Sequence, residues 1–65
     1  MARLRTGAFA RAVGFSERIA RVYADTKLIP SERDSSGSRL FDEAHVPLAR
    51  AVYAERLARS GQRVA

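Results

Sequence analysis

Apolar residues recur at helical spacing in three stretches of this 65-residue chain. In the first, about residues 7–13, Phe9 and Val13 fall on one face of a helix. We expect Thr6 to cap this helix and Gly14, which tolerates a positive φ, to end it. The pattern therefore predicts a short amphipathic helix near the start of the chain.

The second stretch, about residues 17–26, is predicted to be a helix capped by Ser16, with an acid in the first turn that suits the helix dipole. Only Gly14 and Phe15 separate it from the first helix, and so short a joint forces two helices to cross steeply, as in a helix-turn-helix. The face predicted to turn inward holds Ile19, Ala20, Tyr23 and Thr26. The face predicted to turn outward holds Glu17, Arg18, Arg21, Val22 and Asp25.

The pattern changes after the second helix. Leu28 and Ile29 are expected to return to the core, and Pro30 bars continuation of the helix. Residues 34–37, Asp-Ser-Ser-Gly, have the composition of a tight turn and are flanked by two short extended runs. We therefore expect a two-stranded hairpin over about residues 29–41, which must lean on the helices because it is too short to be stable alone.

The third stretch, about residues 43–59, carries an apolar stripe at helical spacing. Its members are Val46, Ala49, Val52, Tyr53 and Leu57. Pro47 is compatible with this helix if residues 42–45 form a loose or 3₁₀ turn before it. Ser60 and Gly61 are expected to end the helix and to begin a tail over residues 60–65, of which residues 62–65 are expected to be frayed.

The order helix, tight turn, helix, hairpin, helix predicts the fold class. It is mainly α: a winged helix-turn-helix with three helices and a short two-stranded hairpin wing, in one domain over residues 1–65. In such domains the second helix enters the major groove of DNA. Residues 17–26 are therefore the predicted recognition helix, and residues 29–41 are the predicted wing.

Charge adds a class of partner to this picture. The chain has 12 basic and 7 acidic residues, a net charge of +5, and every basic residue except Lys27 is arginine. Arginine forks onto phosphate and onto guanine edges, so the excess points to a polyanion: DNA, RNA or an acidic membrane surface. A GC-rich genome is a second explanation for abundant arginine. The hydrophobic content of 46% is that of a globular protein.

The predicted DNA-binding residues lie on the outward face of the second helix and on the hairpin. They are Ser16, Glu17, Arg18, Arg21, Val22, Arg33, Ser36 and Arg39. The alternative for the helix is a solvated face on which Arg21 pairs with Glu17 or Asp25. The alternative for the hairpin is charged protection of an exposed edge. Strand alternation also puts Arg39 on the same side as the apolar Phe41, unless the strand ends between them.

The residues that catalysis or a metal would need are scarce. Cysteine is absent from the sequence and His45 is its one histidine, so we expect no disulfide, metal site or cofactor and place this histidine facing solvent. Asp42 and Glu43 are explained by helix capping, and no enzyme is expected. No apolar run is long enough to cross a membrane. Residues 1–16 lack acids, which leaves a mitochondrial transit peptide as a minor alternative.

Three segments resemble the DNA-binding domain of MerR-type regulators and the related small excisionase-like proteins. "GFSERIARVYADTKLIP" is similar to the family's G-V-S-x-x-T-L-R-Y-Y-E-x-x-G-L-L-P, and "RDSSGSRLF" is similar to its wing, R-x-x-x-G-x-R-x-Y. "FDEAHVPLARAV" resembles the start of the following helix. The match runs in register from about Thr6 to Leu57 and implies a winged helix-turn-helix that binds DNA.

The departures from this pattern alter particular contacts. Ala20 and Ala49 stand where the family has Leu, which thins the core, and Val22 stands where it has a Tyr that commonly touches phosphate. Lys27 replaces the glycine that ends the helix, so that turn is expected to differ. The long helix that pairs MerR-type subunits and the effector domain do not follow within the sequence. We therefore expect no small-molecule effector, no coiled-coil dimer and a monomer in free solution.

The function expected from these observations is sequence-specific binding of duplex DNA. The leading role is that of an excisionase-like recombination directionality factor, which assists an integrase and binds DNA beside neighbouring copies. The alternative is a stand-alone MerR-like transcription regulator, and a lower alternative is an RNA- or ribosome-associated basic protein. The expected location is the bacterial cytoplasm, on DNA, with no contact to a membrane.

Overall fold

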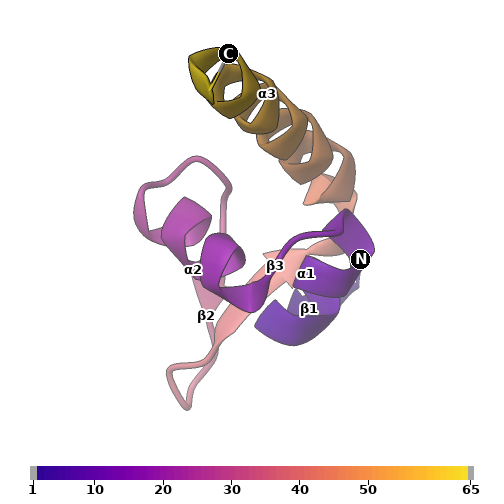
Figure 1. Ribbon diagram of the computed structural model, residues 1–65. Coiled ribbons are helices and arrows are strands. Elements are labelled where there is room, and N and C mark those ends of the chain that lie inside the picture. The colour runs from indigo at the N-terminus through magenta and orange to yellow at the C-terminus, as the bar shows by residue number, and fades with distance from the viewer. Residues whose placement is uncertain (1, 65) are drawn as a thin grey trace.

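The computed structural model describes residues 2–64 and has three helices and a small sheet (Figure 1). The two short helices cross beside the sheet, and the long third helix extends away from them, so the molecule measures 45 × 19 × 17 Å. The predicted class, a mainly helical winged helix-turn-helix, is confirmed. No helix within the described range is long and apolar enough to span a membrane.

The first helix, α1 (Thr6–Val13), ends where the sequence predicts. Gly14 adopts a φ of 99°, and its N–H donates to the carbonyl of Ala10 at 2.8 Å, which closes the last turn. The predicted cap is wrong: Thr6 is the first helical residue, and Arg5 before it makes no side-chain capping bond. The reason is that residues 3–5 form a strand, which delivers the chain directly into the helix.

The second helix, α2 (Glu17–Asp25), confirms its predicted cap, since the Ser16 Oγ accepts from the N–H of Ile19 at 3.2 Å. Tyr23 and Ala20 are buried and the five residues predicted to face outward are exposed. One inward prediction is wrong: Thr26 is exposed, because its Oγ1 turns back to donate to the carbonyl of Val22 at 2.8 Å.

The turn after α2 keeps the left-handed geometry that a glycine would adopt. Lys27 has a φ of 61°, a conformation uncommon for a residue with a Cβ atom. It allows the N–H of Leu28 to donate to the carbonyl of Tyr23 at 2.9 Å. Ile29 then enters the core with 1% exposure, as predicted, while Leu28 is half-buried against it. Lys27 therefore holds a left-handed conformation that a residue with a Cβ atom adopts only at an energetic cost.

The sheet has one strand more than the sequence predicts. β2 (Glu32–Arg33) and β3 (Arg39–Asp42) form the predicted hairpin, but β1 (Arg3–Arg5) also pairs with β3, giving the antiparallel order β1-β3-β2. The partner of Phe41 is Leu4 in β1. A three-residue strand carries almost no alternation signal of its own, so only its pairing with β3 reveals it.

The third helix begins as predicted and ends later. A 3₁₀ turn, η1 (Glu43–His45), precedes α3 (Val46–Val64), and Asp42 caps that turn by accepting from the N–H of Ala44 at 2.9 Å. The predicted end at Ser60 and Gly61 is wrong, because the helix continues through them to Val64. Residue 65 lies outside the described residues.

The core is built from aromatic rings contributed by every layer. Phe9 of α1 and Phe41 of β3 stack with ring centroids 4.4 Å apart, and both are fully buried. Phe15, in the turn between α1 and α2, meets Tyr23 and Tyr53 edge to face at 5.6 and 5.3 Å. No charged side chain is fully buried among the residues whose burial is described.

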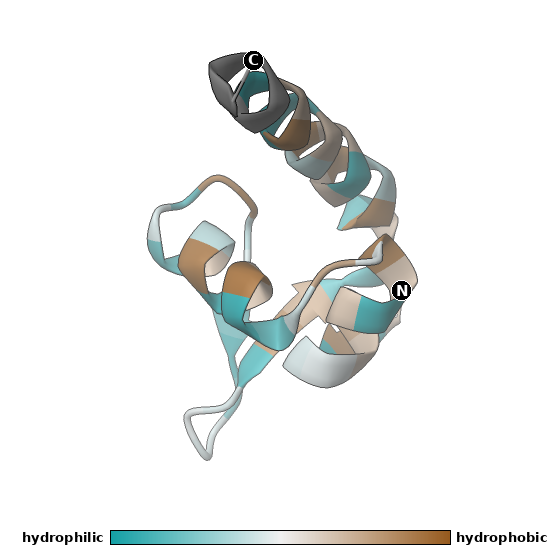
Figure 2. Ribbon diagram, in the orientation of Figure 1, coloured by the Kyte–Doolittle hydropathy of each residue, from teal (hydrophilic) through white to brown (hydrophobic). Residues whose placement is uncertain are grey.

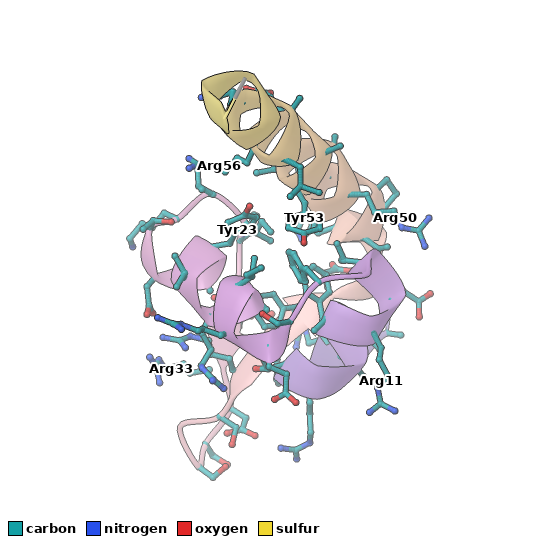
Figure 3. The ribbon with its side chains drawn as sticks, in the orientation of Figure 1. Arg11, Tyr23, Arg33, Arg50, Tyr53 and Arg56 are labelled. Atoms are coloured by element: carbon teal, nitrogen blue, oxygen red, sulfur yellow. The ribbon has the colours of Figure 1, made fainter. Side chains whose placement is uncertain are left out.

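Only the first half of α3 packs on this core. Ala49 is fully buried and Val46, Val52 and Tyr53 are half-buried, but Leu57 is 54% exposed, so its predicted inward position is wrong. Leu57 is not among the partly buried apolar residues that pack against the core, and Figure 2 shows the later turns of α3 extending away from the rest of the domain. Arg50 ties α3 to α1 by donating to the carbonyl of Ala12 at 2.8 Å, and the guanidinium of Arg56 lies 5.8 Å from the centre of the Tyr23 ring (Figure 3).

Candidate nucleic-acid interface

The predicted binding residues gather on one side of the molecule, on the outward face of α2 and on the wing. Ser16, Glu17, Arg18, Arg21 and Val22 are all exposed. On the wing, Arg33 and Ser36 are exposed, whereas Arg39 is half-buried. Figure 3 shows Arg33 on the wing side of the body and Arg11 of α1 on the other side. The fold therefore brings the two predicted groups of residues together.

The tip of the wing is ordered by one carboxylate. Oδ1 of Asp34 accepts from the N–H of Ser36 at 3.0 Å, from its Oγ at 2.7 Å and from the N–H of Ser38 at 2.9 Å. The hydrogen bond from the Ser36 side chain, followed by that from the Ser38 backbone, lowers the pKa of Asp34. Gly37 takes the positive φ of 88° that closes the turn. The Ser36 hydroxyl, a predicted DNA contact, thus also serves the turn.

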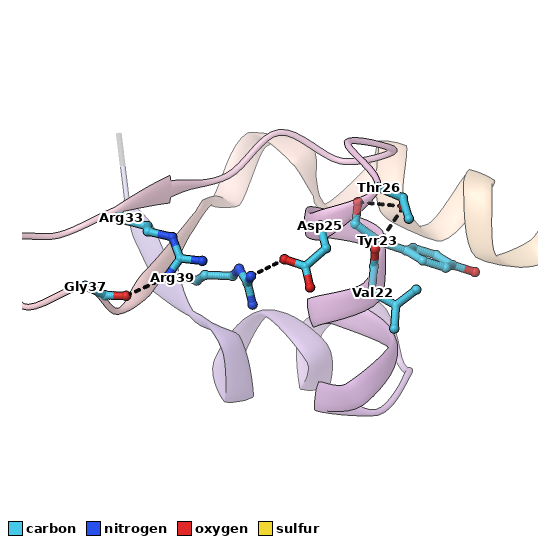
Figure 4. A network of polar contacts seen from close by, with 7 residues as sticks. All are labelled: Val22, Tyr23, Asp25, Thr26, Arg33, Gly37 and Arg39. Atoms are coloured by element: carbon cyan, nitrogen blue, oxygen red, sulfur yellow. Dashed lines mark hydrogen bonds and ion pairs between the residues drawn. The ribbon is translucent and has the colours of Figure 1, made fainter.

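The two wing arginines have different surroundings (Figure 4). Arg33 Nη1 donates to the carbonyl of Gly37 at 3.0 Å, across the hairpin, and the residue remains exposed. Arg39 instead forms an ion pair with Asp25 at the end of α2, and its side chain is only 15% exposed. Arg39 and Phe41 lie on the same side of β3, because they are two residues apart on one strand. Phe41 is buried in the core, and Arg39 reaches Asp25 at the end of α2.

The ion pair between Arg39 and Asp25 changes what is available on α2. One alternative to DNA contact was that Arg21 is neutralised by Glu17 or Asp25. Within residues 2–64, Arg21 forms an ion pair with neither. Glu17 turns toward α1, where a methyl group added to Gly7 would lie 3.4 Å from its Oε2. Arg21 is therefore exposed with its positive charge unpaired among the described residues.

A further arginine, which the sequence did not single out, belongs to the same surface. A recess of 340 Å³ opens between the start of α1, the outward face of α2 and the wing. Its charged lining residues are Arg5, Glu17, Arg21, Arg33 and Arg39. The absence of acids from residues 1–16 was the one feature of the sequence that could have pointed to Arg5. The residues around Arg5 do not indicate that β1 brings it to the wing.

The one histidine lies outside this surface and is not placed as predicted. His45 is half-buried rather than facing solvent, and its Nδ1 is buried with no hydrogen-bond partner among the described residues. It lines a separate recess of 210 Å³ beside Asp42 and Glu32. Within residues 2–64 no three His, Cys, Asp or Glu side chains are grouped so as to hold a metal ion.

The helix-turn-helix, the wing and the arginine surface together define a winged helix-turn-helix DNA-binding domain. Residues 4–57 match the family described as MerR HTH family regulatory protein, and the chain belongs to that family. The resemblance predicted from its three segments is thereby confirmed, and with it DNA binding in a regulatory role. No curated protein and no solved structure gives a significant match to the chain.

Proposed function

We propose that this domain reads duplex DNA with α2 in the major groove and with the wing on the flanking backbone. The observation that carries the proposal is Arg21, which is exposed on the outward face of α2 beside the exposed Arg18 and has no ion-pair partner in the described part of the chain. Arginine at the start of a recognition helix can bond guanine edges, while wing residues meet phosphates. The proposed contacts are Ser16, Glu17, Arg18, Arg21, Val22, Arg33, Ser36 and Arg39.

The proposed role is that of a recombination directionality factor of the excisionase type. Copies would bind adjacent sites and bend the DNA, so that an integrase assembles an excisive complex. The support for this role is the resemblance of the three segments to small excisionase-like proteins, together with an α3 that stands away from the body and exposes Leu57 to a neighbour. In this role the protein is a monomer in free solution.

A stand-alone transcription regulator is the second candidate. The family's description as regulatory proteins favours it. The two roles differ in where the protein binds: repeated sites at an attachment locus beside an integrase gene for the first, and a promoter for the second. A footprint of the protein on its own genomic region separates them.

The binding mode has its own test. Because phosphate contacts release counterions, the logarithm of the binding constant should fall with the logarithm of the salt concentration with a slope of about −4 to −6, if about five phosphates are neutralised. A flat response, or tighter binding to structured RNA than to any duplex, would contradict the proposal and favour an RNA-binding protein. Light scattering of the free protein tests the monomer, and a stable dimer on one palindromic site would favour the transcription regulator.

A further inference from the structure

We propose that the recess between α1, α2 and the wing is a seat for a backbone phosphate of DNA, and that Arg5 is one of its ligands. The inference rests on the proposed function, because it specifies how the duplex is held on the same face. Arg5 is not part of the recognition helix or of the hairpin. It comes from β1, the strand that pairs with β3.

The charge around the recess is strongly one-sided. Four arginines line it, one each from β1, α2, β2 and β3, against the single lining carboxylate of Glu17. Two further acids lie nearby: Asp25 is engaged by Arg39, and Asp34, at the wing tip, feels the charge of Arg5 but is occupied by hydrogen bonds from Ser36 and Ser38. The lining of the recess itself keeps an excess of positive charge, which an anion of phosphate size would neutralise.

Two of these arginines are held in place and two are not. Arg33 is fixed by its bond to the carbonyl of Gly37, and Arg39 by its ion pair with Asp25. Arg5 and Arg21 are exposed, and their side chains have no hydrogen-bond or ion-pair partner within the described part of the chain. Arg33 and Arg39 are therefore preorganised, and the side chains of Arg5 and Arg21 can turn onto a phosphate in the recess.

The placement of Arg5 near the wing has independent support. The hydrogen bonds from Ser36 and Ser38 are the main causes of the lowered pKa of Asp34, and the positive charge of Arg5 adds to them. In the register of β1 and β3, Arg5 lies opposite Leu40, the residue that follows Arg39. The pairing therefore brings Arg5 to the base of the wing. A phosphate in the recess would thus contact the body of the domain and the wing at once.

Salt dependence of binding to a mixed-sequence duplex tests the seat with the full chain. We expect Arg5→Gln to reduce the steepness of the log–log salt slope by about 0.9, the effect of one lost phosphate contact. Arg5→Lys should keep the slope, because it keeps the charge. Arg11→Gln is the matched control: this exposed arginine of α1 lies away from the wing in Figure 3, and its replacement should leave the slope unchanged.

The result that overturns the seat is a slope unaffected by Arg5→Gln, or reduced equally by Arg11→Gln. A wild-type protein that binds no duplex would instead overturn the proposed function, so the two failures are distinguishable. A second measurement needs no variant: in NMR titrations of the unaltered chain, the guanidinium Nε–H signals of Arg5 and Arg21 should shift on adding duplex and that of Arg11 should not. Unmoved signals from Arg5 would also overturn the seat.

Discussion

The aromatic interior and the arginine surface of this domain are held together in opposite ways. Inside, Phe9, Phe41 and their neighbours pack ring against ring without a fully buried charge. On the surface, hydrogen bonds and one ion pair fix some arginines and leave Arg21 and Arg5 unpaired among the described residues. α2 belongs to both regions, since Tyr23 points inward. Stability and DNA binding should therefore respond to different side chains of the same small domain.

The largest effect expected is on the interior. Phe41→Ala removes a fully buried ring that stacks on Phe9, and such a truncation costs about 3–5 kcal/mol. The free energy of unfolding of a protein domain is only about 5–15 kcal/mol, so this loss is a large part of it. The midpoint of a urea melt should therefore fall to a clearly lower urea concentration. Leu57→Ala, at a position 54% exposed, is the control and should change stability by less than about 0.5 kcal/mol. A similar melt for both variants would mean that the core is misplaced.

The next effect concerns the surface, and replacing the exposed Arg21 should leave the melt unchanged. Arg21→Ala is expected to cost about 1–3 kcal/mol of binding and to relax discrimination at particular base pairs. Arg39→Ala should weaken binding to all sequences alike, because its side chain is turned to Asp25 and holds the wing rather than facing bases. Binding constants on a panel of mutated sites measure both. If Arg39→Ala alters base preference and Arg21→Ala acts uniformly, the docking is the reverse of the one proposed.

A smaller effect of opposite sign is expected where the two regions join, at the end of α2. The positive φ at position 27 costs a residue with a Cβ atom about 1–2 kcal/mol, and glycine avoids this cost. Glycine in turn loses about 0.5–1 kcal/mol because its unfolded backbone has more conformational entropy. Lys27→Gly should therefore stabilise the domain by about 0.5–1 kcal/mol. Lys27→Ala, which keeps the Cβ atom, is the matched control and should bring no such gain in the thermal melt. Equal melts for the two variants would show that the turn is not strained.

The smallest effect is the response of the wing tip to acid. The hydrogen bonds from Ser36 and Ser38 favour the charged form of Asp34, so the pKa of this carboxyl is lower in the folded wing than in the unfolded chain. Its contribution to wing order is present at neutral pH and is lost as the pH falls through the lowered pKa, below about 4. The amide signals of both serines in an NMR pH titration report the midpoint. A midpoint above the ordinary aspartate value would contradict this account, and Asp34→Asn should abolish the transition.

Much of the binding surface follows from local signals in the sequence. Ser16 and Gly14 mark the ends of their helices through backbone preferences that need only a few neighbouring residues. The period of the apolar residues in α2 then places Arg21 and Arg18 outward. The turn over residues 34–37 is equally local, because Asp34 bonds residues two and four positions ahead. These features could be predicted because each depends on contacts close in sequence.

The remaining features depend on contacts between residues far apart in the chain. β1 exists because β3 is there to pair with it, and that pairing is what brings Arg5 to the recess. Asp25 meets Arg39 across 14 residues, so this carboxylate holds a wing arginine and leaves Arg21 without an ion pair among the residues described. Leu57 continues an apolar stripe yet is exposed, because it does not pack against the core as Val52 and Tyr53 do. The residues next to an arginine in the sequence do not indicate which distant residue it will contact. The partners of the arginines are therefore decided by the tertiary structure.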